Sequence, residues 1–338
     1  MTAPATMEAL LVDELPAGSE WRYEPKWDGF RCLALRTGGE VALWSRSGKP
    51  LGRYFPEIET LIAGLPAGDL ALDGELVIET ADGLSFDALS QRLHPAESRV
   101  RKLAAERPAL FIAFDLLGWG KQQLEQTPLA ERRQWLERLV QKAKAPSLLL
   151  SPQTGDIAQA RDWLKRSGGA LDGVIAKRSD EPYRAGERAM LKIKHHRSAD
   201  CVVGGYRSAA SGGGVASLLL GLYGDEGLLH HVGFCSSFKA AERREWAAEL
   251  APLGGGEGFT GNRPDKPSRW SRERTAEWVP LRPELVVEVL YDQVTNGRFR
   301  HGTRLLRRRP DKRPDQCRCE QLSHPLTPAG LADLLRNG

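Results

Sequence analysis

The sequence predicts an α+β protein of two domains, built mainly from antiparallel sheets, with a small β-barrel as the second domain. At 338 residues the chain exceeds the usual size of one core, and 41% of its residues are hydrophobic, enough for globular cores. Short alternating stretches separated by turn residues recur, and the composition shifts near Ala199. We therefore expect a first domain over residues 1–197 and a second over residues 198–338.

The first half of the chain reads as strands and hairpins interrupted by a few helices. FRCLALRTGGEVALWSRSG and DLALDGELVIE each predict a pair of strands, and the apolar run ALFIAFDLLG predicts a buried central strand. Thr127-Pro128 predicts the start of one helix, and a second is expected from Ala158 to Lys165, ending at Gly168-Gly169. LDGVIAKR and MLKIKHH then predict two more strands.

The second half shows a different pattern of short strands. CVVGGYR, VASLLLGLYG and LLHHVGF predict strands joined by glycine-rich turns, and a helix around Ala240 to Leu250 follows them. ELVVEVLYD and TRLLRRRPDK predict the last strands. A handful of short strands with one helix suits a small closed barrel of the OB-fold type. Residues 208–214 and the stretch GGGEGFTGNRPDKPS are expected to be loops.

Charge and cysteine content limit the possible settings. The net charge is only +4, so any contact with nucleic acid would depend on local basic patches. The five cysteines are scattered, as is typical of reduced thiols in a cytoplasm, and Cys317 and Cys319 have no second pair with metal-ligand spacing. The first residues lack the pattern of a signal peptide, and no run approaches the length of a membrane span. We expect a soluble cytoplasmic protein.

The stretch YEPKWDGFR places one lysine in an unusually constrained setting. Pro25 stiffens the chain before Lys26 and biases Glu24 towards an extended conformation. Gly29 permits a tight turn and the close approach of a ligand, and Asp28 can accept a hydrogen bond. This arrangement suits a nucleophilic lysine whose amine is kept neutral by nearby positive charge. A solvated lysine in a turn is the alternative reading.

Other charged residues supply what such a lysine needs. Lys192 and Lys194 lie two apart in LKIK, so on a strand they share a face, where they can bind phosphates and lower the pKa of a third lysine. Another candidate phosphate-binding array stands near the other end of the chain: Arg304, Arg307, Arg309 and Lys312. Either group could instead be a solvated basic edge.

Carboxylates occupy similar strand positions. Asp73 and Glu75 share a face in LDGELVI, while alternation puts Asp172 and Lys177 on opposite faces of their strand unless the strand bends. Glu75 and Asp172 are suited to hold Mg²⁺ through one or two oxygens, leaving its other positions to water and phosphate.

Seven of these stretches occur in an order that resembles a known superfamily. KWDGFR resembles motif I of the covalent nucleotidyltransferases, which comprise DNA ligases, RNA ligases and messenger-RNA capping enzymes. SRSGK, LDGEL, AFDLL, LDGVIAK, LKIK and RRRPDK resemble motifs Ia, III, IIIa, IV, V and VI. Together they cover residues 21–312, and the chain is most similar to bacterial ATP-dependent DNA ligases of the LigC type, close to the ligase module of LigD. The resemblance implies an ATP-grasp-like adenylation domain followed by an OB-fold domain.

The resemblance also implies roles in phosphoryl chemistry. Lys26 would attack the α-phosphate of ATP to give lysyl-AMP, and Lys192 and Lys194 would hold that phosphate. Glu75 and Asp172 would bind AMP and position a metal ion, Mg²⁺ or Mn²⁺.

Four further positions would bind the nucleoside. Glu24 would meet the edge of the adenine, and Phe114 would stack on its face. Arg31 and Arg46 would contact the ribose and the phosphate.

The last motif would act from the second domain. Arg309, Asp311 and Lys312 would orient the leaving pyrophosphate. The resemblance implies a monomer that acts on nicked double-stranded DNA, without a large N-terminal DNA-binding domain, in DNA repair and with repair proteins as further partners.

Two residues depart from the pattern of many DNA ligases. Asp172 stands where many have glutamate, and Met190 stands where many have tryptophan. An RNA ligase or a capping-type guanylyltransferase on the same scaffold is the first alternative. A non-catalytic OB-type binding module with a degenerate nucleotide domain is the second, although intact Lys26, Glu75 and Lys192 argue against it.

Overall fold

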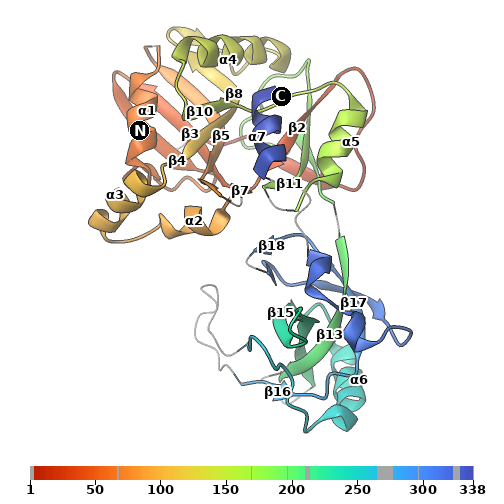
Figure 1. Cartoon of the computed structure of the whole chain (residues 1–338). Helices are drawn as coiled ribbons and strands as arrows, with labels where there is room; N and C mark the ends of the chain where they lie inside the picture. Colours follow the sequence, from red (N-terminus) through yellow and green to blue (C-terminus); the bar gives the residue numbers. More distant parts are fainter. Residues whose placement is uncertain are drawn as a thin grey trace. The chain divides into compact units, whose positions relative to one another are not determined.

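The computed structural model describes most of the chain as two compact units (Figure 1). The described residues are 4–66, 68–81, 83–168, 170–195, 197–209, 214–264, 277–295, 297–322 and 328–337. The first unit comprises Met1–His195 and Pro325–Gly338, and the second comprises His196–His324. Parts of both predicted loops, residues 210–213 and 265–268, lie outside the described residues.

A four-stranded sheet in the first unit carries the predicted lysines. Its order is β1-β12-β11-β2, and β1 runs parallel to β12 while the other pairs are antiparallel. The strands are β1 (Ala9–Val12), β12 (Met190–Ile193), β11 (Leu171–Arg178) and β2 (Trp21–Trp27). The register of β11 against β2 shifts between Leu171 and Val174, where Gly173 has φ +127°. Strand β2 is therefore an edge strand, paired within this sheet only with β11.

A second sheet of six strands follows the order β10-β8-β5-β3-β4, with β9 added to β8. Its strands are β3 (Phe30–Thr37), β4 (Glu40–Ser45), β5 (Leu70–Val77), β8 (Leu110–Trp119), β9 (Gln122–Gln123) and β10 (Leu148–Leu150). The hairpin predicted at Gly38-Gly39 joins β3 to β4, and β8 is central as expected. DLALDGELVIE is one long strand, β5, rather than the predicted pair, because it pairs with β3 on one side and β8 on the other. The short hairpin β6 (Glu79–Thr80) and β7 (Gly83–Leu84) follows it.

Helices cover both sheets with their apolar faces. They are α1 (Pro56–Gly64), α2 (Phe86–Gln91), α3 (Glu97–Glu106), α4 (Leu129–Ala143) and α5 (Ile157–Lys165), with the 3₁₀ turn η1 (Gly52–Tyr54) before α1. Helix α4 begins directly after Pro128 as predicted, and Leu136 and Leu139 bury against the six-stranded sheet. Asp156 caps α5 by accepting a hydrogen bond from the amide of Ala158, and Trp163 packs against the four-stranded sheet.

The second unit is a curved antiparallel sheet with one long helix. The sheet order is β15-β14-β13-β17-β20, with β16 added to β13. Its elements are β13 (Arg197–Ser208), β14 (Val215–Tyr223), β15 (Leu229–Cys235), α6 (Ala240–Leu250), η2 (Ala251–Leu253), β16 (Val279–Pro280), β17 (Val286–Tyr291), β18 (Val294–Thr295), β19 (Arg298–Phe299), β20 (Arg304–Arg308), η3 (Pro314–Gln316) and η4 (Cys319–Leu322). Among the described residues, β15 and β20 do not pair in a ladder, so the predicted closed barrel does not form. An isolated bridge from Cys235 to Thr303 joins the end of β15 to the start of β20. The α+β class, with an OB-type second unit, is confirmed.

The last helix belongs to the first unit, not to the second. Helix α7 (Pro328–Asn337) lies among the elements of the first unit in Figure 1, although it follows the second unit along the chain. Leu331 and Leu334 bury in a cluster with residues of the four-stranded sheet. The expected second domain, residues 198–338, therefore differs from the second unit of the structure at its C-terminal end.

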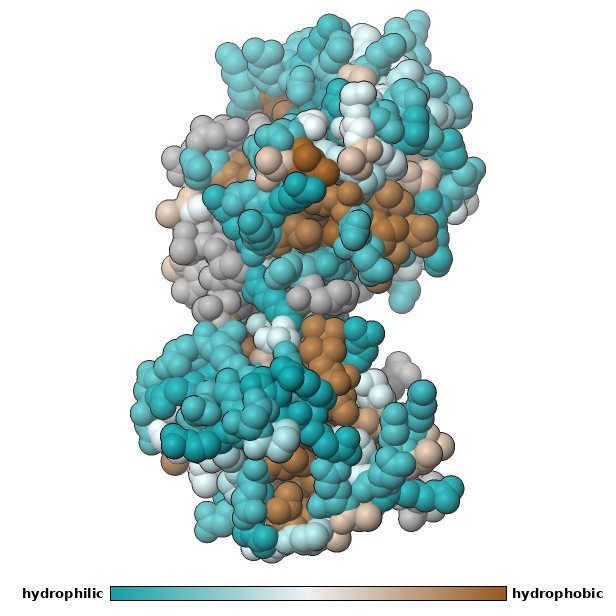
Figure 2. All heavy atoms as spheres, turned by 90° about the vertical axis from the view of Figure 1, so that its right-hand side faces the viewer, coloured by the Kyte–Doolittle hydropathy of each residue, from teal (hydrophilic) through white to brown (hydrophobic). Residues whose placement is uncertain are grey.

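Figure 2 shows that hydrophilic residues cover most of the face it draws, with smaller apolar areas between them. Every helix within the described ranges is too short or too polar to cross a bilayer. All five cysteines are free thiols.

Candidate active site

A cavity of about 1190 Å³ opens within the first unit. Lys26 on β2 and Lys192 on β12 contribute to its wall from the four-stranded sheet, and Glu75 on β5 and Phe114 on β8 contribute from the six-stranded sheet. Most of the site residues predicted in this unit line it: Glu24, Lys26, Arg31, Arg46, Glu75, Phe114 and Lys192. The two sheets thus bring together motifs that are up to 168 positions apart in the sequence.

Lys26 is held by an aspartate that it shares with a second lysine. The Nζ atom of Lys26 lies 2.5 Å from Oδ2 of Asp172, and the Nζ atom of Lys194 lies 2.9 Å from Oδ1 of the same carboxylate. Pairing of Pro25 with Val174 on β11 sets this approach, and the bulge before Val174 turns Asp172 towards Lys26.

The charges of Lys26, Asp172 and Lys194 determine the protonation state of Lys26. Burial tends to lower the pKa of Lys26, but the Asp172 carboxylate outweighs it and the pKa is raised. Burial likewise opposes ionisation of Asp172, yet the two ammonium groups hold its pKa below the ordinary value. The sequence predicted that neighbouring cations would keep Lys26 neutral. Instead Lys26 is an ammonium that donates a hydrogen bond to Asp172. The proton in this hydrogen bond is one that the amine must lose before it can act as a nucleophile.

Lys192 is one of the cations of the cavity wall that have no counter-ion among the described residues. It makes no ion pair with any residue that the structure describes. Burial lowers its pKa, and the positive charges of Lys26, Arg46 and Lys194 lower it further. A partly buried ammonium among other cations is a site for an anion.

Glu75 carries the strongest perturbation among the carboxylates of the cavity. Removal from water raises the pKa of Glu75 to about 8, against the opposing charges of Lys26 and Arg31. Gly29 makes this packing possible, because a β-carbon there would lie 2.2 Å from the carbonyl oxygen of Leu76 and 2.8 Å from Cγ of Glu75. The glycine of K-W-D-G thus allows the backbone of β5 to approach closely, and it also lines the cavity.

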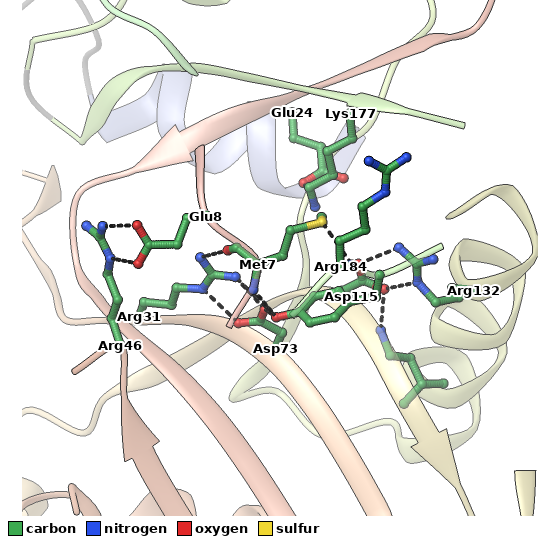
Figure 3. Close-up of polar contacts among 12 residues, drawn as sticks. Met7, Glu8, Glu24, Arg31, Arg46, Asp73, Asp115, Arg132, Lys177 and Arg184 are labelled. Carbon is green, nitrogen blue, oxygen red and sulfur yellow. Dashed lines mark hydrogen bonds and ion pairs between the residues drawn. The ribbon is translucent and has the colours of Figure 1, made fainter. Parts of the chain in front are cut away.

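A buried ion pair forms another part of the wall (Figure 3). Glu24 accepts hydrogen bonds of 2.8 Å from both Lys177 and Gln153. The Nζ atom of Lys177 lies 4.7 Å from the centre of the Phe114 ring. Lys177 and Gln153 were absent from the predicted site. Strict alternation from Asp172 made Lys177 point away, and the glycine at position 173 was the signal that the strand could bend.

The two predicted arginines are engaged by carboxylates. Arg31 donates two hydrogen bonds, of 3.0 and 2.6 Å, to Asp73 and one of 2.6 Å to the carbonyl oxygen of Met7. Arg46 donates bonds of 3.0 and 2.6 Å to Glu8, which also lines the cavity (Figure 3). Met7 and Glu8 were not predicted, because an N-terminal segment without a recognisable motif offers no signal.

The cations of the last motif form their own cluster in the second unit. Arg309 and Lys312 donate hydrogen bonds of 2.7 and 2.8 Å to opposite oxygens of Asp200, and Arg309 also pairs with Asp311 at 2.9 Å. Asp200 lies on β13, which pairs with β17, and β17 pairs with β20. Asp200 was not among the predicted residues.

The two predicted metal ligands differ in availability. Both oxygens of Asp172 are taken by ammonium groups. Glu75 has no hydrogen-bond or ion-pair partner within the part of the chain that the structure describes. No group of three or more acidic, histidine or cysteine side chains suited to a metal occurs among those residues. The protein atoms therefore offer a single available carboxylate rather than a complete cage.

A lysine paired with an aspartate in the cavity of a two-sheet domain, followed by an OB-type unit, is the arrangement of the covalent nucleotidyltransferases. The family model of the ATP dependent DNA ligase domain matches residues 6–194, and that of the ATP dependent DNA ligase C terminal region matches residues 211–312. The chain belongs to the family of ATP-dependent DNA ligases. It is an enzyme that uses ATP, and the family match favours DNA ligases over RNA ligases and capping enzymes.

Relatives agree with this assignment. The chain is 46% identical to DNA ligase C1 of Mycolicibacterium smegmatis, over 90% of this chain and 89% of the relative. It is 33% identical to the multifunctional non-homologous end joining DNA repair protein LigD of Mycobacterium tuberculosis, over 88% of this chain and 37% of that protein. A solved structure from a study of Lig E DNA ligases, 18% identical, has a TM-score of 0.54 over 90% of this chain and 99% of that one, which shows a common fold.

Proposed function

We propose that this ligase seals nicks between a 5′-phosphate and a 3′-hydroxyl in duplex DNA through an AMP carried on Lys26. The observation that supports this most directly is the pairing of Lys26 with Asp172 in the wall of a cavity that also holds the unpaired Lys192. The amine of Lys26 attacks the α-phosphorus of ATP, a nitrogen–phosphorus bond forms, and pyrophosphate leaves. The AMP then passes to the 5′-phosphate, and attack by the 3′-hydroxyl releases it. The covalent intermediate divides sealing into easier steps.

Residues of the cavity position the phosphates. Lys192 offers an uncompensated ammonium to the α-phosphate, while Lys194 shares Asp172 with the nucleophile. When phosphate oxygens pair with the lysines, Asp172 is released to take the proton of Lys26. Positioning and neutralisation of charge are the main contributions a protein makes to phosphoryl transfer.

The base and ribose would lie against the wall that Phe114 and Arg31 form. The ring of Phe114 offers a stacking surface, and Lys177 and Arg31 lie near its face and thereby fix its surroundings. Glu24, held by Lys177 and Gln153, stands at the edge of this region.

We further propose that Mg²⁺ or Mn²⁺ arrives with ATP, bound to its phosphates. Magnesium in nucleotide sites is commonly held by one or two carboxylates together with substrate phosphates and water. Glu75 is the available carboxylate, and its raised pKa means that binding of the ion would displace a proton.

Nicked DNA would be held by phosphate contacts from basic residues such as those of β20. The repair role named for the mycobacterial LigD supports a repair setting for this chain. Five free thiols fit a reducing cytoplasm, and we propose that the enzyme acts there as a monomer, with repair proteins as further partners.

Replacement of the nucleophile tests the proposal. Lys26→Arg keeps the positive charge but cannot attack phosphorus near neutral pH, so this variant should neither gain the mass of one AMP after incubation with ATP nor seal a nick. The parent protein should take label from α-labelled ATP and not from GTP. Labelling of the Lys26→Arg protein would overturn the assignment of the nucleophile, and labelling of the parent by GTP would favour a capping-type activity.

A further inference from the structure

Helix α7 completes the core beneath the strands of the candidate active site. Leu331 is 1% exposed and Leu334 is 9% exposed. They share one buried cluster with Trp27, Val174 and Ile193, from three strands of the four-stranded sheet. The side chain of Leu331 also reaches the short hairpin β6–β7, coming 3.9 Å from the position a β-carbon would take at Gly83.

The members of this cluster are sequence neighbours of the charged residues in and beside the cavity. Trp27 follows Lys26, and Val174 lies two residues after Asp172 on the bulged stretch of β11. Ile193 stands between Lys192 and Lys194 on β12. Because alternate residues of a strand point to opposite faces, packing of Trp27 and Ile193 on one face sets where the lysines point on the other.

Strand β2 has particular need of such packing. It is the edge strand of its sheet, so β11 alone holds it by a ladder of hydrogen bonds, apart from an isolated bridge between Tyr23 and Thr154. Besides the ion pair with Asp172, side-chain packing beneath the strand restrains Lys26, and α5 and α7 contribute to that packing.

The position of α7 in the chain makes this arrangement informative. The family models match residues 6–194 and 211–312, so neither includes the helix. The chain leaves the first unit at His195 and returns to it at Pro325. The second unit is thus an insertion between the catalytic strands and a helix of their own core.

We infer that helix α7 is a working part of the adenylation domain, in which Leu331 and Leu334 act as positioning residues for transfer of AMP to Lys26. The inference rests on the role of Lys26 proposed above. Loss of the helix should misplace the lysines more than the wall with Phe114 and Glu75. The six-stranded sheet contributes only the buried residues Val77 and Ile112 to this cluster, and its main core is a different one. A misplacement of about 1 Å can lower a rate about a hundredfold.

Two substitutions in the full chain separate buried from exposed positions. Leu334→Asp places a carboxylate in the core, and the matched control Ala329→Asp places the same group on the exposed side of the helix. We expect the Leu334→Asp protein to form lysyl-AMP about tenfold to a hundredfold more slowly at saturating ATP, with a KM for ATP within about threefold of the parent. The Ala329→Asp protein should match the parent.

Rescue separates positioning from a general loss of folding. A protease site is introduced within residues 323–327 of both the parent and the Leu334→Asp chain. The cleaved parent should keep its rate, because packing rather than the covalent link holds the helix. The cleaved Leu334→Asp protein should regain most of the rate when an excess of a peptide with the parent sequence of residues 328–338 is added.

Each outcome decides the inference. A parental rate in the Leu334→Asp protein would overturn it, and so would a loss that the peptide does not restore. The Lys26→Arg protein is assayed beside these variants. Incorporation of labelled AMP into the Lys26→Arg protein would refute the proposed nucleophile. A slower rate of lysyl-AMP formation in the Leu334→Asp protein, with no label on the Lys26→Arg protein, would bear on the role of helix α7 and leave the nucleophile unchallenged.

Discussion

Replacement of Lys177 by methionine should strongly destabilise the first unit. Lys177 and Glu24 are almost completely buried, with side chains 4% and 3% exposed, and their charged atoms lie 2.8 Å apart. The remaining oxygen of Glu24 accepts its bond from Gln153, which is uncharged. Methionine keeps the apolar stem of the lysine and removes only the ammonium, so Glu24 would be left as a buried charge without a counter-ion.

The burial of the pair sets the size of the effect. Removal of one member of a buried ion pair costs about 3–5 kcal/mol, because the other charge has lost its compensation. In a domain of this size each kcal/mol lowers the unfolding temperature by about 2–4 °C, so the first unit should unfold roughly 6–20 °C lower. The double variant Glu24→Gln with Lys177→Met carries no buried charge at this place and should recover most of the loss.

Thermal unfolding of the four proteins in this double-mutant cycle measures the coupling directly. The matched control is Arg101→Met. Arg101 forms an ion pair with Glu97 on the surface, where the two side chains are 75% and 70% exposed. That change should alter stability by less than about 1 kcal/mol. The reasoning is refuted if Lys177→Met costs no more than Arg101→Met, or if adding Glu24→Gln makes the protein less stable still.

Three further outcomes follow from the charges. Desolvation raises the pKa of Glu75 in the folded protein to about 8, so the parent should lose a few kcal/mol of stability as the pH rises from about 4.5 to 8. The Glu75→Gln protein should not show this loss. Urea unfolding of both proteins at pH 5.5 and 8.5 measures it, and equal pH dependence of the two would contradict the prediction. Arg309→Ala and Lys312→Ala should fail to form lysyl-AMP yet seal a nick adenylated beforehand, and equal loss in both assays would remove them from the first step. Nick affinity should fall steeply with salt, each phosphate contact adding about −0.9 to the slope of log K against log salt, and a binding constant unchanged by salt would exclude phosphate contacts as its source.

Much of the candidate site was predictable because its residues occupy short motifs with fixed spacing. Lys26, Glu75 and Lys192 were found from local patterns and Phe114 from the family resemblance, and the structure places all four around one cavity. Local sequence patterns also placed the helix of residues 240–250 and the central strand of the larger sheet of the first unit correctly. These features depend on local propensity and on alternation, which a single sequence records.

The features that escaped prediction depend on contacts between distant segments. The bulge at Gly173 reversed the expected direction of Lys177, and Asp172 reversed the expected direction of the pKa shift of Lys26. The carboxylate partner of Arg46, and one of the partners of Arg31, came from a segment around Glu8 that has no motif. The return of α7 to the first unit left no sign in local composition, because its apolar spacing is that of any amphipathic helix.

The pairing of charges in the cavity suggests how it can hold many cations before ATP binds. Lys26 and Lys194 share Asp172, and Arg46 is held by Glu8, so most of the positive charge is already compensated by carboxylates. Bringing a bare cluster of cations together would raise the free energy of the folded protein, whereas pairs that are partly exposed cost little to exchange. A nucleotide can therefore enter by replacing one anion with another. Lys192, which has no counter-ion among the described residues, is a cation that the phosphates can engage without displacing a carboxylate. In the proposed mechanism, contact of the phosphates with the remaining lysines would then free Asp172, so that binding of the anion would itself prepare Lys26 for attack.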